Sequence, residues 1–558
     1  MDFDLVLEEI GEFGQYQRIN YFLICLPVLF ASANSLSYVF TAGIPNYRCF
    51  IPNCDNPDRP RYNEPWVNNS APGVTDINGV YVPQQCRRYI QRIGNYSISN
   101  DTCPHSMFYN EIESCKEWVF DENERTIVQD WNVTCFENQW KLAFVGTMHF
   151  AGLIVGTASS GVLADKYGRK IIFTVCIIFM SITGVLQGLA WDYGSFLIFA
   201  FLNAVGTSGV YPLAFILAVE MVGPKKREMS SVLLNYFYAL GEAAVGLVAW
   251  LSRDWQILQF VLSAPPILFA FYYWIIPESV RWLLARDSKD EALEIIRKVA
   301  KINGKELSTA MISRFERKEM EEIDPEQKAN KISIVPITPL EKDIQKSEML
   351  RTCKEAMQSR IMVIRFIVLL YIWLANAFVY YGLSLNSTSL SGNKYLNFSL
   401  VCLIEIPGYS LAWITMNKIG RRWSLAGSLF LCAICCAAGG FLTDGADGLG
   451  TTWVVITMFL IGKLGITSSF TVIFVYSAEM LPTIIRSGGV GTLSTTGRFG
   501  AMIATFVPLL GTYFKPLPLL LFGGVALFGS AISLILPETF QTKLPDTVEE
   551  AEQIGKNI

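Results

Sequence analysis

A small set of ionisable residues interrupts otherwise apolar stretches of this sequence. The set comprises His149, Glu242, Arg365, Glu405, Lys463 and Arg498. Charged side chains are costly inside a bilayer, and they are retained there to bind a ligand, to move an ion or to pair with each other. A glutamate can receive an ammonium group, and an arginine can hold a carboxylate through two parallel hydrogen bonds. These residue types predict a binding site for a small charged organic molecule within a membrane.

Aromatic residues in the same stretches can supply a cationic subsite. Ring faces attract an ammonium group by about 0.5–2 kcal/mol each. The substrate-binding set that we predict is Arg498, Glu405, Lys463, Glu242, Tyr211, Tyr236, Trp373, Tyr380 and Tyr381. Some of these assignments have alternatives. Glu405 and Lys463 can pair with each other, and aromatic residues on any one helix can simply pack.

His149 and Arg365 have alternatives of their own and stay outside the predicted set. His149 is the one ionisable residue in the interior of its segment, which favours a neutral, hydrogen-bonded core histidine. Arg365 lies near the end of its segment, where a long side chain can extend to the membrane surface.

The elements that must position these residues are long apolar helices. The chain of 558 residues is 51% hydrophobic and 17% charged, whereas soluble domains carry about 25% charged residues. The segments 171–190 and 256–276 contain no charged residue, and each can cross an apolar layer of about 30 Å. We predict an all-α membrane protein whose helices span 20–42, 140–163, 171–190, 195–219, 230–251, 256–276, 361–383, 397–416, 423–442, 451–477, 487–510 and 516–536.

The basic residues of the short loops predict the orientation. They gather on one side, at Lys166, Arg169, Lys170, Lys225, Lys226, Arg227, Lys418, Arg421 and Arg422. Short loops rich in lysine and arginine stay in the cytoplasm. The expected layout is a cytoplasmic N-terminus 1–19, a six-helix half 20–276 with an outer loop 43–139, a cytoplasmic loop 277–359, a second half 360–536 and a cytoplasmic tail 537–558. The acidic N-terminus lacks the basic region of a signal peptide, so the first helix is expected to direct insertion.

The outer loop has the composition of an oxidising, extracellular compartment. Six of the 13 cysteines lie there, at Cys49, Cys54, Cys86, Cys103, Cys115 and Cys135. Glycosylation sequons begin at Asn68, Asn95, Asn100 and Asn132. We predict three disulfides, whose pairing the spacing leaves open.

The two predicted halves repeat each other at one end of corresponding helices. Glu220-Met221, followed by Arg227, recurs as Glu479-Met480, followed by Arg486. The stretches 165–169 (DKYGR) and 277–279 (PES) recur as 417–421 (NKIGR) and 537–539 (PET). Two similar six-helix halves predict a pseudo-two-fold axis along the membrane normal, with the substrate site between the halves near the middle of the membrane.

Several motifs resemble one transporter family. Residues 161–170 (GVLADKYGRK) resemble the loop between helices two and three of the major facilitator superfamily. Three features resemble the organic cation, carnitine and organic anion transporters, including insect members of that group. They are residues 277–284 (PESVRWLL), the cysteine-rich outer loop and residues 478–483 (AEMLPT). The resemblance implies twelve transmembrane helices and a gating set of Asp165, Arg169, Glu220, Arg227, Glu278, Arg281, Glu479 and Arg486.

Arg498 separates the subgroups that the sequence resembles. It lies in the stretch 494–500 (STTGRFG). Simple organic cation transporters resemble this stretch but carry aspartate at the position of Arg498, whereas carnitine and organic anion members carry arginine. An arginine here favours a substrate carboxylate and repels a bare cation.

We therefore expect alternating-access transport of a small organic cation or zwitterion, carnitine-like or derived from a biogenic amine, across the plasma membrane. The alternatives are transport of an organic anion and a non-transporting membrane receptor. Sodium or proton coupling is left open, with Glu242 and His149 as conceivable couplers. The sequence has no nucleotide-binding loop, no metal-ligand spacing and no basic face for nucleic acid, so we expect no cofactor, no metal and no enzymatic activity.

Overall fold

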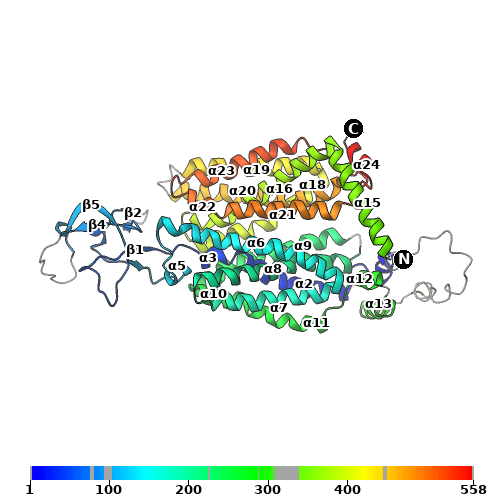
Figure 1. Ribbon diagram of the computed structural model, residues 1–558, viewed down its shortest axis with the longest axis horizontal. Coiled ribbons are helices and arrows are strands. Elements are labelled where there is room, and N and C mark those ends of the chain that lie inside the picture. The colour runs from blue at the N-terminus through cyan, green and yellow to red at the C-terminus, as the bar shows by residue number, and fades with distance from the viewer. Residues whose placement is uncertain are drawn as a thin grey trace, which may run out of the picture.

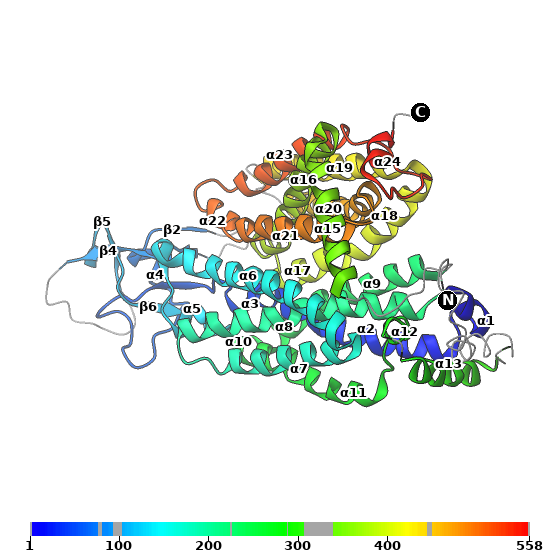
Figure 2. The same ribbon diagram turned by 45° about the vertical axis from the view of Figure 1, so that its right-hand side comes forward.

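The computed structural model describes residues 3–75, 81–92, 103–223, 226–286, 288–305, 308, 339–443 and 449–555. Small β-sheets lie at one end of the molecule, and both chain termini lie at the other (Figure 1). We name these the disulfide end and the terminus end. Between them, two bundles of long helices lie side by side, one from each half of the chain (Figures 1 and 2).

The helices follow the twelve predicted segments in order. The first half consists of α2 (Gln15–Leu36) with α3 (Tyr38–Thr41), α6 (Cys135–Tyr167), α7 (Arg169–Gly188), α8 (Tyr193–Met221), α9 (Arg227–Ser252) and α10 (Trp255–Ser263), which η3 (Pro265–Phe271) and α11 (Tyr272–Ile275) extend. The second half consists of α16 (Arg360–Asn386), α17 (Lys394–Leu403) with α18 (Glu405–Ile419), α19 (Arg421–Thr443), α20 (Leu449–Met480), α21 (Arg486–Ala504) with α22 (Val507–Leu510), and α23 (Leu517–Ser533).

Among the described residues, ten spans are long and apolar enough to cross a membrane by length and composition. The helices α21 and α23 fall outside that set. The helix α23 has 17 residues, and α21 carries Arg498 among several glycines and threonines, which lowers its hydropathy. Both helices nevertheless lie within the second bundle (Figure 1).

Prolines break two of the predicted helices. Pro265 and Pro266 convert the middle of the sixth segment into the 3-10 helix η3. Pro407 has no N–H, so the carbonyl of Leu403 loses its helical donor, and the eighth segment divides into α17 and α18 at that point. The break makes Glu405 the first residue of α18, where the positive end of the helix dipole favours a carboxylate.

The disulfide end is a loop-rich domain with three two-stranded antiparallel sheets. The strands pair as β1 (Tyr47–Cys49) with β6 (Trp118–Phe120), β2 (Gly73–Thr75) with β3 (Tyr81–Pro83), and β4 (Arg87–Gln91) with β5 (Phe108–Ser114). The predicted disulfides are present as Cys49–Cys115, Cys54–Cys103 and Cys86–Cys135. Asn68 and Asn132 are exposed, and Asn95 and Asn100 lie outside the described residues.

The pairing of the loop cysteines gives a direct prediction. Peptide mapping without reductant should recover three cross-linked pairs, and thiol reagents should miss all six cysteines until a reductant is added. Each bond closes a long loop, and its loss is expected to cost about 4 kcal/mol of stability. Cys176 and Cys353 are partly exposed free thiols and serve as labelling controls. A cross-link that joins Cys49 to Cys54 would contradict the pairing.

Short helices cover the terminus end of the bundles. The helix α1 (Phe3–Ile10) packs on α13 (Lys289–Asn303) through Val6, Leu7 and Ile296. The Asn303 amide donates to the carbonyl of Ile10 at 2.9 Å. In the other half, α24 (Val548–Gln553) packs against the bundle core. The remaining helices here are α12 (Val280–Ala285) and α15 (Pro339–Gln358).

Candidate functional site

The centre of the second bundle holds a fully buried ion pair. Lys463 on α20 lies 2.9 Å from Glu405 on α18, and both side chains are 0% exposed. The Lys463 ammonium also contacts the Ser384 hydroxyl at 2.7 Å and the Tyr380 carbonyl at 3.2 Å. It lies 3.4 Å from the centre of the Tyr380 ring. The sequence predicted that a substrate ammonium would bind Glu405 and an aromatic ring. In the structure, the ammonium of Lys463 makes both of these contacts.

Glu405 has further donors on its second oxygen. The hydroxyls of Tyr380 and Tyr409 donate to it at 2.7 and 3.1 Å. Because Lys463 and these hydroxyls satisfy it, Glu405 is not free to bind a substrate directly. The pairing that the sequence left open as an alternative is the one that the structure shows.

Glu242, from the first bundle, reaches the same cluster with fewer partners. It is 0% exposed. The Tyr380 hydroxyl lies 3.5 Å from Glu242 and 2.7 Å from Glu405. Among the described residues, its oxygen Oε1 has no hydrogen-bond partner. Glu242 therefore remains available to a cationic group.

Arg498 on α21 lies deep in the molecule, and no carboxylate of the described residues pairs with it. Its position twelve residues into the helix places it about 18 Å from the terminus end of α21. Its guanidinium donates to Ser494 Oγ at 2.6 Å and, across the interface between the halves, to Thr157 Oγ1 at 3.1 Å. Its Nε has no partner in the described part of the chain. The group keeps donor capacity for an anion.

Further unpaired polar atoms gather around these two residues. Within the described residues, the Tyr38 hydroxyl and His149 Nε2 are buried without a hydrogen-bond partner. The rings of Tyr38 and His149 lie 5.6 Å apart, and Tyr38 interacts with Glu242 and with Tyr381. Tyr381 in turn interacts with Arg498. Buried polar atoms are nearly always paired in proteins, so this group indicates a site that a polar ligand or water completes.

Several predicted residues lie elsewhere. The Tyr211 hydroxyl donates to Asn235 at 2.6 Å, and the Tyr236 hydroxyl bonds Ser410 at 2.7 Å across the halves. Trp373 is a core residue whose ring packs on Phe474 and whose indole donates to Ser477. Each of these side chains already has a partner on its own or a neighbouring helix, and its contact with a substrate stays a prediction.

Arg365 and His149 also have defined positions. The Arg365 guanidinium donates to the carbonyls of Ala551 and Ile554, at 2.6 and 2.9 Å. It therefore binds the end of α24, at the terminus end of the bundle. His149 is buried in the first bundle, as expected of a core histidine, but the expected hydrogen bond to Nε2 is absent among the described residues.

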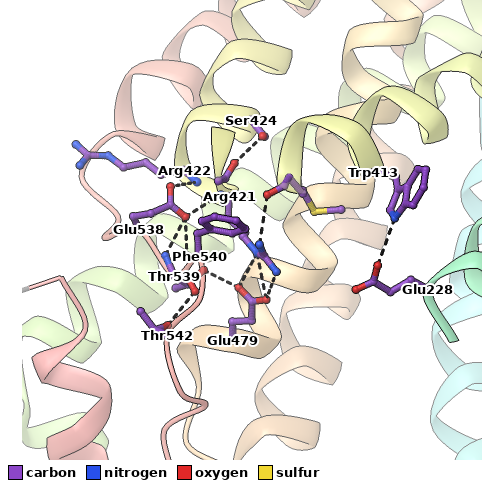
Figure 3. A network of polar contacts seen from close by, with 12 residues as sticks. Glu228, Trp413, Arg421, Arg422, Ser424, Glu479, Glu538, Thr539, Phe540 and Thr542 are labelled. Atoms are coloured by element: carbon purple, nitrogen blue, oxygen red, sulfur yellow. Dashed lines mark hydrogen bonds and ion pairs between the residues drawn. The ribbon is translucent and has the colours of Figure 1, made fainter. Parts of the chain in front are cut away.

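The repeated motifs form the same structure twice at the terminus end. Glu278 accepts hydrogen bonds from the backbone N–H groups of Arg169 and Lys170, both at 3.0 Å. Glu538 does the same for Arg421 and Arg422, at 2.8 and 3.1 Å (Figure 3). Each glutamate thus caps the first turn of a transmembrane helix, where a carboxylate is favoured.

Glycine is required beside each of these caps. Gly168 and Gly420 have φ values of 109° and 93°, which side chains rarely adopt. A Cβ atom on Gly168 would lie 2.4 Å from Glu278 Oε2, and one on Gly420 would lie 2.6 Å from Glu538 Oε2. The glycines that flank the two basic loops therefore allow the capping carboxylates to approach.

The arginine partners differ between the two halves. In the first half, Arg169 pairs with Asp165 at 3.2 Å. In the second half Asn417 replaces that aspartate, and Arg421 pairs with Glu479 at 2.9 Å instead (Figure 3).

Hydroxyls and carbonyls complete this network. Ser279 donates to Glu220, and Thr539 donates to Glu479 at 2.6 Å. Arg486 binds the carbonyls of Leu481 and Pro545, and its role in gating stays a prediction. Arg227 and Arg281 lie in the same region of the terminus end.

Contacts between the halves close the disulfide end. Phe40 stacks on Tyr395 with ring centres 5.3 Å apart, and Lys394 forms an ion pair with Glu124. Thr147 on α6 bonds Thr505 next to α21, at 3.2 Å. These contacts join elements of both bundles on one side of the Glu242–Arg498 region.

The terminus end of the same interface is more open. Ser159 on α6 and Thr492 on α21 are exposed, and there is open space where Gly161 and Gly491 would carry a Cβ atom. Exposed polar side chains within membrane helices indicate water instead of lipid. A contact across the halves remains between Trp413 and Glu228, at 3.3 Å (Figure 3).

Two six-helix bundles with a buried charged site between them, closed at one end, define a membrane transporter of the major facilitator type. The inward open xylose transporter XylE of E. coli has a similar fold, with a TM-score of 0.56 at 16% identity over 77% of this chain and 94% of that chain. The sequence family described as sugar (and other) transporter matches residues 91–551.

Sequence comparison identifies the group within that class. An organic cation transporter protein of Drosophila melanogaster is 32% identical over 100% of this chain and 95% of its own length. The human organic cation/carnitine transporter 2 is 31% identical over 98% of this chain and 94% of its own length. The protein belongs to the sugar (and other) transporter family and, within it, to the organic cation and carnitine transporters. It is a multi-pass membrane protein of a family of transporters.

Some residues of the site were missed in the sequence. Tyr38, Thr157 and Ser494 are ordinary residues for apolar helices, and nothing in their spacing marks them. Tyr409 lies one turn after Glu405, so an i, i+4 search for hydroxyls around each buried charge would have found it. Ser384 likewise lies one turn after Tyr380 on α16.

Proposed function

We propose that the protein moves a small organic zwitterion, with an ammonium and a carboxylate group, across the plasma membrane by alternating access. The observation that carries the proposal is the pair Glu242 and Arg498. They are of opposite charge, come from different bundles and each keep a polar atom without a partner among the described residues. A zwitterion satisfies both groups at once, with its ammonium at Glu242 and its carboxylate at Arg498.

The partners of Lys463 argue against an organic anion as the main substrate. Its ammonium is used by Glu405, Ser384 and Tyr380, so Arg498 is the basic group left to the site. Glu242 would repel a dianion. A cation without a carboxylate would be repelled by the positive charge of Arg498. A carnitine-like betaine fits the charges best, and the human relative named for carnitine supports that substrate class.

The structure also suggests the direction in which the site is open. With its three disulfides, the disulfide end belongs outside the cell. Both termini then lie in the cytoplasm, and the site opens inward. Transport requires the Lys394–Glu124 and Phe40–Tyr395 contacts to separate as the terminus end closes.

Uptake measurements test the function directly. Cells that express the chain should take up labelled carnitine saturably, and more efficiently than tetraethylammonium, a biogenic-amine conjugate or an aromatic organic anion. Each probe is measured with and without sodium, and surface labelling confirms expression. Saturable uptake of the anion alone would overturn the proposal, and so would the absence of any uptake by protein at the surface.

A further inference from the structure

The buried charges around Glu405 do not balance. The ammonium of Lys463 pairs with Glu405, and Glu242, which shares the Tyr380 hydroxyl with Glu405, has no ion-pair partner among the described residues. All three side chains are 0% exposed. The free energy of an ion buried without a counter-ion is unfavourable by several kcal/mol, so such a group binds a proton or a cation instead. The cluster therefore lacks one positive charge when no substrate is bound.

The hydrogen-bond geometry shows which of the two carboxyl groups lacks a positively charged partner. Lys463 lies on Glu405, and the single Tyr380 hydroxyl proton points to Glu405 at 2.7 Å, against 3.5 Å to Glu242. The carboxyl of Glu242 is close enough to that of Glu405 to interact with it. Two carboxyl groups that share a site cannot both be ionised cheaply. A protonated Glu242 can donate where the ionised form would only repel.

We propose that Glu242 holds a proton in the unloaded carrier and releases it when the cationic group of the substrate binds, so that the protein exchanges substrate for protons. The inference rests on the proposed function and adds the coupling ion to it. One positive charge replaces another beside Glu405, and the buried cluster keeps the same charge in both states. The proton leaves Glu242 to water on the side where the site is open.

Other groups around Glu242 do not supply the missing charge. The charged ones are Glu405 on α18 and Lys463 on α20, already paired with each other. The remaining titratable groups that interact with Glu242 are neutral hydroxyls and one thiol, on Tyr38, Tyr238, Tyr380, Tyr381, Tyr409 and Cys402. Arg498 interacts with Tyr381 and donates to Thr157 and Ser494.

Proteoliposomes that contain the purified full-length chain test the exchange. With the membrane potential clamped by potassium and valinomycin, an acidic interior should accelerate uptake of labelled carnitine several-fold over equal pH. A protonophore should remove the acceleration. Adding carnitine to the detergent-solubilised protein in weak buffer should release about one proton per chain, because the ammonium displaces it from the carboxyl pair.

Two variants separate a coupling role from a structural one. Glu242→Gln keeps the shape of the protonated side chain, so carnitine counterflow at equal pH should persist with weaker affinity, while the pH acceleration and the proton release disappear. Glu137→Gln, at an exposed glutamate near the disulfide end of α6, should retain both. Saturable carnitine uptake by the wild type without pH acceleration or proton release would overturn the exchange and leave the proposed function intact. No saturable uptake would overturn both.

Discussion

Replacing Lys463 by methionine is expected to lower the free energy of unfolding by about 3–5 kcal/mol, because it leaves a buried carboxylate without its counter-ion. Methionine has a similar length and is compatible with a membrane helix, so loss of packing contributes little. Thermal unfolding of the purified protein in detergent, followed by tryptophan fluorescence, measures the loss of stability.

The double variant Lys463→Met/Glu405→Gln distinguishes a broken ion pair from a damaged core. Removing both charges should recover most of the lost stability, since uncharged pairs often replace buried ion pairs at little cost. Arg351→Met is the matched control. Arg351 pairs with Glu355 but is 82% exposed, so its loss should cost less than about 1 kcal/mol. If Lys463→Met unfolds at the wild-type temperature, the pair does not exist in the folded protein.

Arg498→Asp is expected to lower kcat/KM for carnitine by about 10- to 100-fold. A hydrogen bond to a charged group contributes about 1.5–3 kcal/mol, and each 1.36 kcal/mol corresponds to a factor of ten. The new carboxylate should at the same time favour tetraethylammonium, so the ratio of the two uptake rates inverts. Initial rates over a range of concentrations, normalised to surface expression, give both values.

Arg498→Lys tests the geometry of the carboxylate contact. A lysine retains the charge but cannot form two parallel hydrogen bonds, so its activity should lie between the wild type and the aspartate variant. Arg351→Asp, the same change at an exposed position, should leave selectivity unchanged. Unaltered selectivity in Arg498→Asp would remove Arg498 from the binding site.

Much of the fold could be predicted because local composition decides it. A segment such as 171–190 must form a helix in a membrane, since every backbone polar group has to be satisfied within it. The repeated motifs at Gly168 and Gly420 mark the same helix start in each half. Two of the twelve helices are not long and apolar enough to count as spans by composition alone, because α21 carries Arg498 with several small residues and α23 is short.

The candidate site was less predictable because its residues already had competing partners. Glu405 and Lys463 were named correctly as buried charges, but their spacing does not show whether they pair with each other or with a ligand. Tyr211 and Tyr236 were named as substrate contacts, yet both bond neighbouring side chains. A hydroxyl on a helix has no preferred partner until another helix lies beside it.

By itself, the sequence determined the membrane-spanning helices, the two-fold repeat and the oxidised loop, because these depend on apolar length, local motif and cysteine content. The tertiary structure decided which charges are neutralised and which remain free. Lys463 reaches Glu405 from a different helix, and Glu242 meets them from the other half of the chain. That choice depends on how the bundles pack, since residues far apart in the sequence become neighbours only when the two halves come together.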